Sequence, residues 1–77
     1  MNWEIKENKL FKQFLFKDFK EAFSFISGIA LLAEEQNHHP EIFNVYNKVE
    51  ISLQTHDAGN TITEKDYILA KAIDALL

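Results

Sequence analysis

Residues 34–40, EEQNHHP, mark the point at which one structural periodicity ends and another begins. Before this stretch the apolar residues recur at helical spacing, and after it they alternate as in a strand. Pro40 cannot continue a helix and disfavours a helical conformation at His39, so the helix is predicted to end around Asn37 to His39. The stretch also holds two of the three histidines in the chain and its only proline.

The helix before this stretch is predicted to begin at Phe19. Asp18 and Glu21 form a capping pair whose carboxylates satisfy and complement a helix N-terminus. The residues of its expected core stripe are Phe19, Ala22, Phe23, Ile26, Ala30 and Ala33. Three further apolar residues widen that stripe: Phe25, Ile29 and Leu32. Gly28 costs about 1 kcal/mol relative to alanine in mid-helix, and close approach of another backbone is a common reason for such a glycine. The wide apolar surface and Gly28 together favour a contact between subunits.

Two strands are predicted before this helix. Trp3 and Ile5 alternate with charged residues, which indicates a short first strand, and residues 7–9 are polar enough to turn the chain. Residues 10–16 carry apolar side chains on both faces and form the second strand. These aromatic residues are expected to belong to the core and to an interface.

The segment from 43 to 54 is also predicted to be extended. Its alternation places Val49, Ile51 and Leu53 on one face and polar residues on the other. By parity, His56 joins the polar face. Residues 47–48 either turn a tight hairpin or mark a bend, so the segment holds one or two strands.

A last helix is predicted to open at a capping box made by Thr63 and Asp66 and to continue to about Leu76. Its core-facing positions are expected to be Leu69, Ala72, Ile73 and Leu76. Residues 1–77 therefore form one α+β domain. An antiparallel sheet with both helices packed on one face is the simplest architecture that buries these apolar surfaces.

The composition excludes several classes of function. A formal net charge of -4 and the lack of a basic tract argue against direct nucleic-acid binding. The lack of cysteine excludes disulfides, thiolate zinc sites and thiol nucleophiles. No apolar run is long enough to span a bilayer, and the N-terminus does not match a signal peptide. We expect a soluble cytoplasmic protein with no membrane partner, in which oligomerisation supplements a small core.

His38, His39 and His56 are candidates for acid–base chemistry, because imidazole both donates and accepts protons near neutral pH. Glu34 lies one helical turn before His38, where its carboxylate can orient or charge-compensate the ring. A purely structural role at the helix end is one alternative, and a zinc site with three imidazoles is another. The divergence of adjacent side chains and the lack of a His-x-x-x-His pair argue against zinc.

Several elements in one order form a recognisable signature. They are Glu34, His38, His39, Pro40, Tyr46, His56 and Asp66, with the flanking segments 14–19 (FLFKDF), 43–49 (FNVYNKV) and 55–59 (THDAG). This pattern resembles the pterin-4a-carbinolamine dehydratase (4a-hydroxytetrahydrobiopterin dehydratase) family. The resemblance implies an α+β fold with the order ββαββα, a four-stranded antiparallel sheet, two helices on one face, and assembly into homodimers or homotetramers. The extra N-terminal helix found in many family members is expected to be lacking here. At two positions common family residues are replaced, with Lys65 at a basic position and Asn60 at a glycine.

The resemblance implies dehydration of a 4a-hydroxytetrahydropterin to the quinonoid dihydropterin, which recycles the tetrahydrobiopterin used by aromatic amino acid hydroxylases. His38 and His56 would be the acid–base pair, in an order that the sequence does not assign. His39 would be a third imidazole near the substrate, and Glu34 would tune His38. The implied substrate-binding residues are Glu34, Asn37, Pro40, Thr55, Asp57 and Asp66. Neither a metal nor another cofactor is implied.

Two alternatives stay open. Animal relatives of the family also stabilise dimers of a homeodomain transcription factor, so a non-catalytic binding module is one. A dehydratase-like role near molybdopterin metabolism is the other. The complete set of His38, His39 and His56 favours the enzyme.

Overall fold

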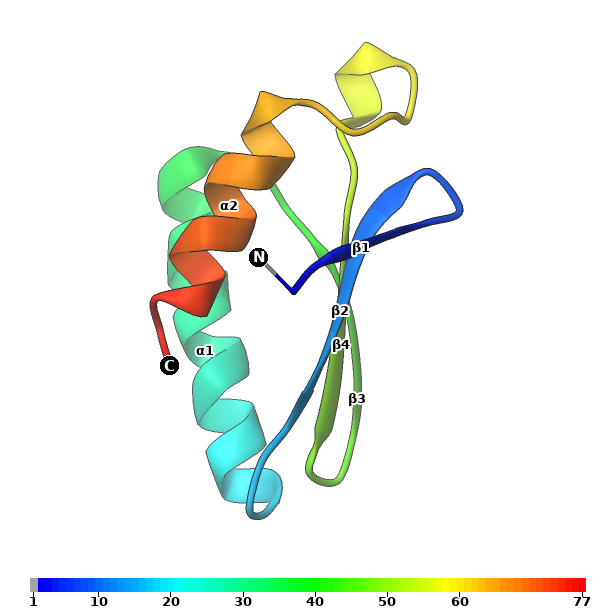
Figure 1. Cartoon of the computed structure of the whole chain (residues 1–77). Helices are drawn as coiled ribbons and strands as arrows, with labels where there is room; N and C mark the ends of the chain where they lie inside the picture. The colour runs from blue at the N-terminus through cyan, green and yellow to red at the C-terminus, as the bar shows by residue number, and fades with distance from the viewer. Residues whose placement is uncertain (1) are drawn as a thin grey trace.

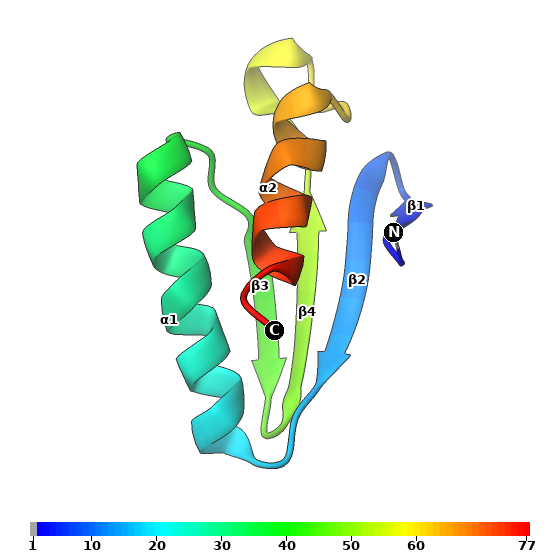
Figure 2. The same ribbon diagram turned by 60° about the vertical axis from the view of Figure 1, so that its left-hand side comes forward.

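Four antiparallel strands form one sheet in the order β1-β2-β4-β3. The computed structural model describes residues 2–77. The strands are β1 (Glu4–Lys6), β2 (Lys9–Leu15), β3 (Glu41–Val45) and β4 (Lys48–Leu53), and the helices are α1 (Phe19–Gln36), the 3-10 turn η1 (His56–Ala58) and α2 (Glu64–Asp74). Both α-helices cover the same face of the sheet, and α2 crosses in front of β3 and β4 (Figures 1 and 2). The predicted α+β architecture is confirmed.

The core lies between the sheet and the two helices. Val49, Ile51 and Leu53 of β4 are completely buried, as their alternation predicts. The other buried members of the core are Leu10, Phe14, Ala22, Phe25, Ile29, Leu69, Ala70 and Ile73. Burial of each large apolar side chain contributes about 1.5–3 kcal/mol, so this cluster is the main source of stability. Neither helix within residues 2–77 combines the length and the apolar character needed to cross a membrane.

The rotation of α1 about its axis differs from the prediction. The buried residues of the helix are Ala22, Phe25, Ile29 and Ala33. Three residues of the predicted core stripe are instead exposed: Phe19, Phe23 and Ala30. The ring of Phe25 lies with its centroid 4.8 Å from that of Phe14 and 4.9 Å from that of Phe16. This aromatic contact with β2 and the segment after it fixes which of the two apolar stripes faces the sheet.

Both predicted helix starts are confirmed. Asp18 caps α1 by accepting a hydrogen bond from the backbone N–H of Glu21 (2.8 Å), while the Glu21 carboxylate accepts from the backbone N–H of Lys17 (3.0 Å). Thr63 and Asp66 form the complete capping box that opens α2. Such caps contribute about 1 kcal/mol each, and they set the ends of helices with otherwise ambiguous boundaries.

The extended segment after Pro40 is a hairpin of two strands. Its turn lies at residues 46–47, one residue before the predicted position, because Val45 pairs with Lys48. Tyr46 adopts a left-handed conformation with φ 49°, and the side-chain amide of Asn44 donates to the carbonyl of Lys48 (2.8 Å). The sequence leaves open whether the chain turns or merely bends here. These local contacts form a tight turn between two strands.

Gly28 faces the side chain of Leu76, and not another backbone as expected. A methyl group at position 28 would lie 3.1 Å from Cδ1 of Leu76. The C-terminal residues therefore cover this part of α1 within the same chain. The close packing at Gly28 needs no second subunit to explain it.

We expect Gly28→Ala to raise the free energy of unfolding by about 0.5 kcal/mol, because alanine is about 1 kcal/mol better than glycine in a helix interior. Leu76 is 42% exposed and close to the C-terminus, so its side chain can move by the few tenths of an ångström required. Urea unfolding followed by circular dichroism measures the change. A destabilised Gly28→Ala variant whose stability is not recovered by Leu76→Ala would contradict this explanation.

Candidate active site

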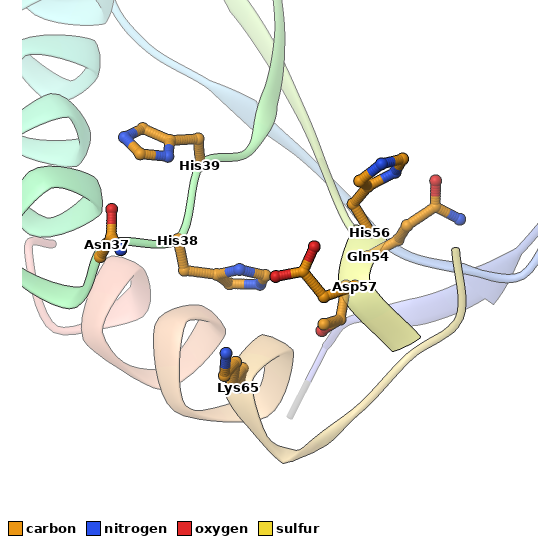
Figure 3. Close-up of a pocket in the computed structure, with 8 residues that line it drawn as sticks. Asn37, His38, His39, Gln54, His56, Asp57 and Lys65 are labelled. Atoms are coloured by element: carbon orange, nitrogen blue, oxygen red, sulfur yellow. The ribbon is translucent and has the colours of Figure 1, made fainter. Parts of the chain in front are cut away.

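The end of α1 separates the two adjacent histidines. Asn37 adopts a left-handed conformation (φ 51°, ψ 44°), and the backbone N–H of His38 donates a hydrogen bond to the carbonyl of Ala33 (3.0 Å). Asparagine tolerates this conformation better than most residues, and Pro40 prevents the helix from continuing. The rings of His38 and His39 consequently point in opposite directions (Figure 3).

His38 is held by a buried carboxylate. Its Nε2 lies 2.6 Å from Oδ1 of Asp66, whose side chain is 0% exposed. The other oxygen of Asp66 accepts hydrogen bonds from the backbone N–H of Thr63 and from the hydroxyl of Thr55, both at 2.8 Å. A carboxylate accepts hydrogen bonds when ionised, so Nε2 of His38 donates and its Nδ1 is left for other contacts. The ring of His38 therefore has a fixed orientation.

The predicted pair of Glu34 and His38 is wrong. Glu34 instead lies with Oε2 2.6 Å from Nε2 of His39, and both side chains are largely exposed. The prediction assumed that the helix continues, so that residues four apart share a face. The left-handed turn at Asn37 interrupts that spacing and directs His38 toward α2.

His56 lies in η1 and not at the end of a strand. β4 ends at Leu53, so the placement of His56 by strand parity is incorrect. The loop is closed by the backbone N–H of Thr55, which bonds the carbonyl of Thr61 at 2.8 Å. Nδ1 of His56 lies 2.9 Å from the side-chain oxygen of Asn60.

These residues surround a cleft of about 220 Å³ between the end of α1, the segment after β4 and the start of α2. Its lining comprises Asn37, His38, His39, Gln54, Thr55, His56, Asp57 and Lys65. The ring of His38 extends across the cleft toward Asp57, and His56 lies on the far side (Figure 3). All three predicted catalytic histidines thus border one cavity.

Six of the nine predicted site residues line the cleft, and three do not: Glu34, Pro40 and Asp66. Glu34 acts on His39 from outside the cleft, and Pro40 belongs to the turn after α1. Asp66 is fully buried behind His38, which disagrees with the prediction of a direct substrate contact.

The sequence interpretation did not select two lining residues, Gln54 and Lys65. Gln54 lies directly after β4, on the polar side that the alternation indicates, so its position was accessible from the sequence. Lys65 precedes Asp66 in the first turn of α2, and only the packing of α2 against the end of α1 brings it to the cleft. Within residues 2–77 no group of three or more histidine and carboxylate side chains is placed to hold a metal ion.

The fold and the cleft define a small α+β protein with a polar, histidine-lined pocket. The sequence model described as Pterin 4 alpha carbinolamine dehydratase matches residues 1–76. The chain belongs to this family. It is 50% identical over 74 residues to the pterin-4-alpha-carbinolamine dehydratase of Drosophila melanogaster, an alignment that covers 94% of this chain and 38% of the fly protein.

Solved structures agree with this assignment. A Brucella melitensis protein described as a transcriptional coactivator/pterin dehydratase superimposes with a TM-score of 0.91 and 41% identity, over 96% of this chain and 80% of its own. A pterin dehydratase-like protein described as a RuBisCO assembly factor in the alpha-carboxysome superimposes with a TM-score of 0.77 and 30% identity, over 97% of this chain and 86% of its own.

We expect Asp66→Asn to lower the free energy of unfolding by about 2–3 kcal/mol, because three donors surround this buried carboxylate and the amide replaces one of its acceptor oxygens with a fourth donor. Urea unfolding measures the loss. Asp57→Asn is the matched control: the same change at an exposed position of the same cleft is expected to alter stability by less than about 0.5 kcal/mol. Equal stabilities of the two variants would contradict the role of Asp66 as a buried acceptor.

Proposed function

We propose that the cleft catalyses the dehydration of a 4a-hydroxytetrahydropterin to the quinonoid dihydropterin. The observation that carries this proposal is the placement of His38 and His56, from two separate segments, on one cleft of about 220 Å³. Membership of the pterin carbinolamine dehydratase family supplies the substrate class.

The reaction requires one proton donor and one proton acceptor. The C4a–O bond breaks as the departing hydroxyl is protonated and leaves as water. A base removes the proton from N5, and the electron pair of that bond forms the C4a=N5 double bond. Electrons stay within the substrate, so neither an oxidant nor a metal is required by the chemistry. Positioned imidazoles suit both proton transfers and contribute about 10²–10⁴-fold each.

His38 and His56 are the proposed acid–base pair. His38 is the more rigid of the two, since its side chain is 12% exposed and bonded to Asp66. His39 is the proposed third imidazole near the substrate, held by Glu34 at the rim. The position of His38 is therefore expected to depend less on the bound substrate than the position of His56 does.

The pterin ring is a flat heterocycle with polar edges, and the cleft offers matching groups. Asn37 and Gln54 supply side-chain amides, Asp57 a carboxylate and Lys65 an ammonium group. The carboxylate of Asp57 is the proposed acceptor for N–H groups of the pyrimidine ring, because hydrogen bonds to a charged acceptor are the stronger ones. Lys65 is the proposed donor to a pterin oxygen.

We expect His38→Ala and His56→Ala each to lower kcat by about 10²–10⁴-fold, since each removes one proton-transfer group. A stopped-flow assay with a synthetic 4a-hydroxytetrahydropterin measures the rate of water loss. His39→Ala is expected to have a smaller effect, because its ring points away from His38.

Two outcomes of this assay bear on the mechanism directly. An unchanged rate in the His38→Ala/His56→Ala double variant would exclude the proposed pair. Loss of wild-type activity on addition of a chelator, and its recovery with Zn²⁺, would establish a metal mechanism in place of acid–base catalysis.

A protein-binding function is the second candidate, and the sheet edge favours it. β3 is an edge strand, and Ile42, Phe43 and Val45 are 41%, 51% and 53% exposed. An apolar edge with unpaired backbone groups is a surface for strand addition by another chain. A second copy of this chain is the proposed partner, which gives a homo-oligomer.

We expect Val45→Lys to lower the molecular mass in solution from an oligomer to a monomer, because a charge on the edge opposes strand pairing. Sedimentation equilibrium measures the mass. Leu31→Lys is the matched control on α1, where the side chain is 75% exposed. A monomeric wild-type protein would exclude this self-association. Binding of an unrelated partner that survives His38→Ala, in a protein with no dehydratase activity, would place protein binding before catalysis.

A further inference from the structure

The loop that carries His56 folds back on itself. The backbone N–H of Thr55 donates to the carbonyl of Thr61 (2.8 Å), and the N–H of Thr61 donates to the carbonyl of Thr55 (3.4 Å). Between them, Gly59 and Asn60 are successive left-handed residues with φ 82° and 58°. This reversal returns the chain to the side of His56, so that Asn60 lies next to the imidazole.

The backbone of Asn60 is held from two directions. Its carbonyl accepts hydrogen bonds from the side-chain amides of Asn8 (3.0 Å) and Gln54 (2.9 Å). Asn8 lies in the turn between β1 and β2, and Gln54 follows β4 directly. The loop is thereby tied to the sheet, and the side chain of Asn60 leaves the backbone from a fixed position.

The side chain of Asn60 contacts one nitrogen of the His56 ring. Its Oδ1 lies 2.9 Å from Nδ1 of His56. An amide oxygen only accepts hydrogen bonds, so this contact is a hydrogen bond when Nδ1 carries the hydrogen. In a neutral imidazole this leaves a lone pair on Nε2, which forms no hydrogen bond within residues 2–77.

We propose that Asn60 is a positioning residue that holds His56 in the Nδ1–H tautomer and makes its Nε2 the general base of the dehydration. The inference rests on the function proposed above and assigns the two roles that the sequence leaves open. His56 takes the proton from N5, and His38 delivers a proton to the departing hydroxyl.

The different partners of the two rings support this assignment. The uncharged amide of Asn60 suits a ring that is neutral before the reaction, whereas the carboxylate of Asp66 suits a ring that is positively charged before it gives up its proton. A base must begin neutral and an acid must begin protonated. The partner of each ring therefore matches one role.

The first test is a spectroscopic one on the ligand-free protein. In long-range ¹⁵N–¹H correlation spectra, Nδ1 of His56 is expected to resonate as a protonated nitrogen and Nε2 as an unprotonated one. Asn60→Gly is expected to abolish this preference, and glycine retains the left-handed backbone at φ 58°. Asn60→Asp keeps an acceptor oxygen and is expected to retain hydrogen on Nδ1. His56 in the Nε2–H form in the wild-type protein would overturn the proposal.

The second test is kinetic. Asn60→Gly is expected to lower kcat about five-fold with little change in KM, since one exposed hydrogen bond sets the population of the reactive tautomer. Asn8→Gly is the matched control, because it removes a contact to the same loop at another left-handed residue (φ 63°) without touching His56. Its kcat is expected to stay within about two-fold of the wild-type value.

The outcomes separate this inference from the proposed function. The wild-type protein could dehydrate the pterin while the Asn60→Gly variant showed the same rate and the same His56 tautomer. That result would overturn the role of Asn60 alone. Equal losses of kcat in Asn8→Gly and Asn60→Gly would reduce that role to loop stability and would also overturn it. A wild-type protein with the expected tautomer and no dehydratase activity would overturn the proposed function, and with it the role of His56 as base.

Discussion

The carboxylate of Asp66 has no exposed surface, and it is tolerated because three donors from three segments surround it. The backbone N–H of Thr63 belongs to the start of α2, the hydroxyl of Thr55 follows β4, and the imidazole of His38 follows α1. Loss of any one donor would leave a buried charge incompletely paired, which costs more than the hydrogen bond itself contributes. The packing of α2 on the sheet and the orientation of His38 therefore depend on the same interaction.

The other half of the site has a different physical basis. His56 and Asn60 are both exposed, and the loop between Thr55 and Thr61 contributes no residue to the core cluster. Segments with few buried contacts open locally at a small cost in free energy, whereas His38 moves only if the buried network breaks. The cleft thus combines a fixed imidazole with one on a loop of lower local stability. A substrate bound between them would add contacts mainly to the loop.

The sequence predicts the fold well where a local rule decides the structure. Three features were recognisable because each depends on neighbours in the chain: the alternation of β4, the capping box at Thr63 and the helix end before Pro40. The rotation of α1 was not, because two apolar stripes compete and the contacts of Phe25 with β2 select one of them. Helical spacing also predicted the wrong partner for Glu34, since the left-handed residue that interrupts the helix leaves no periodic signal in the sequence.

For the candidate site, histidine chemistry and a family signature selected the three histidines that line the cleft but not their partners. The pair of His38 and Asp66 spans 28 residues, so only tertiary packing reveals it. In this pair the start of α2 and the orientation of His38 depend on each other, because the capping box that opens α2 also sets the position of the carboxylate that orients His38. The pair of His56 and Asn60 spans four residues and lies outside the core. Sequence change can therefore tune the proposed base at little cost to folding, whereas any change that reorients the proposed acid also disturbs the packing of α2.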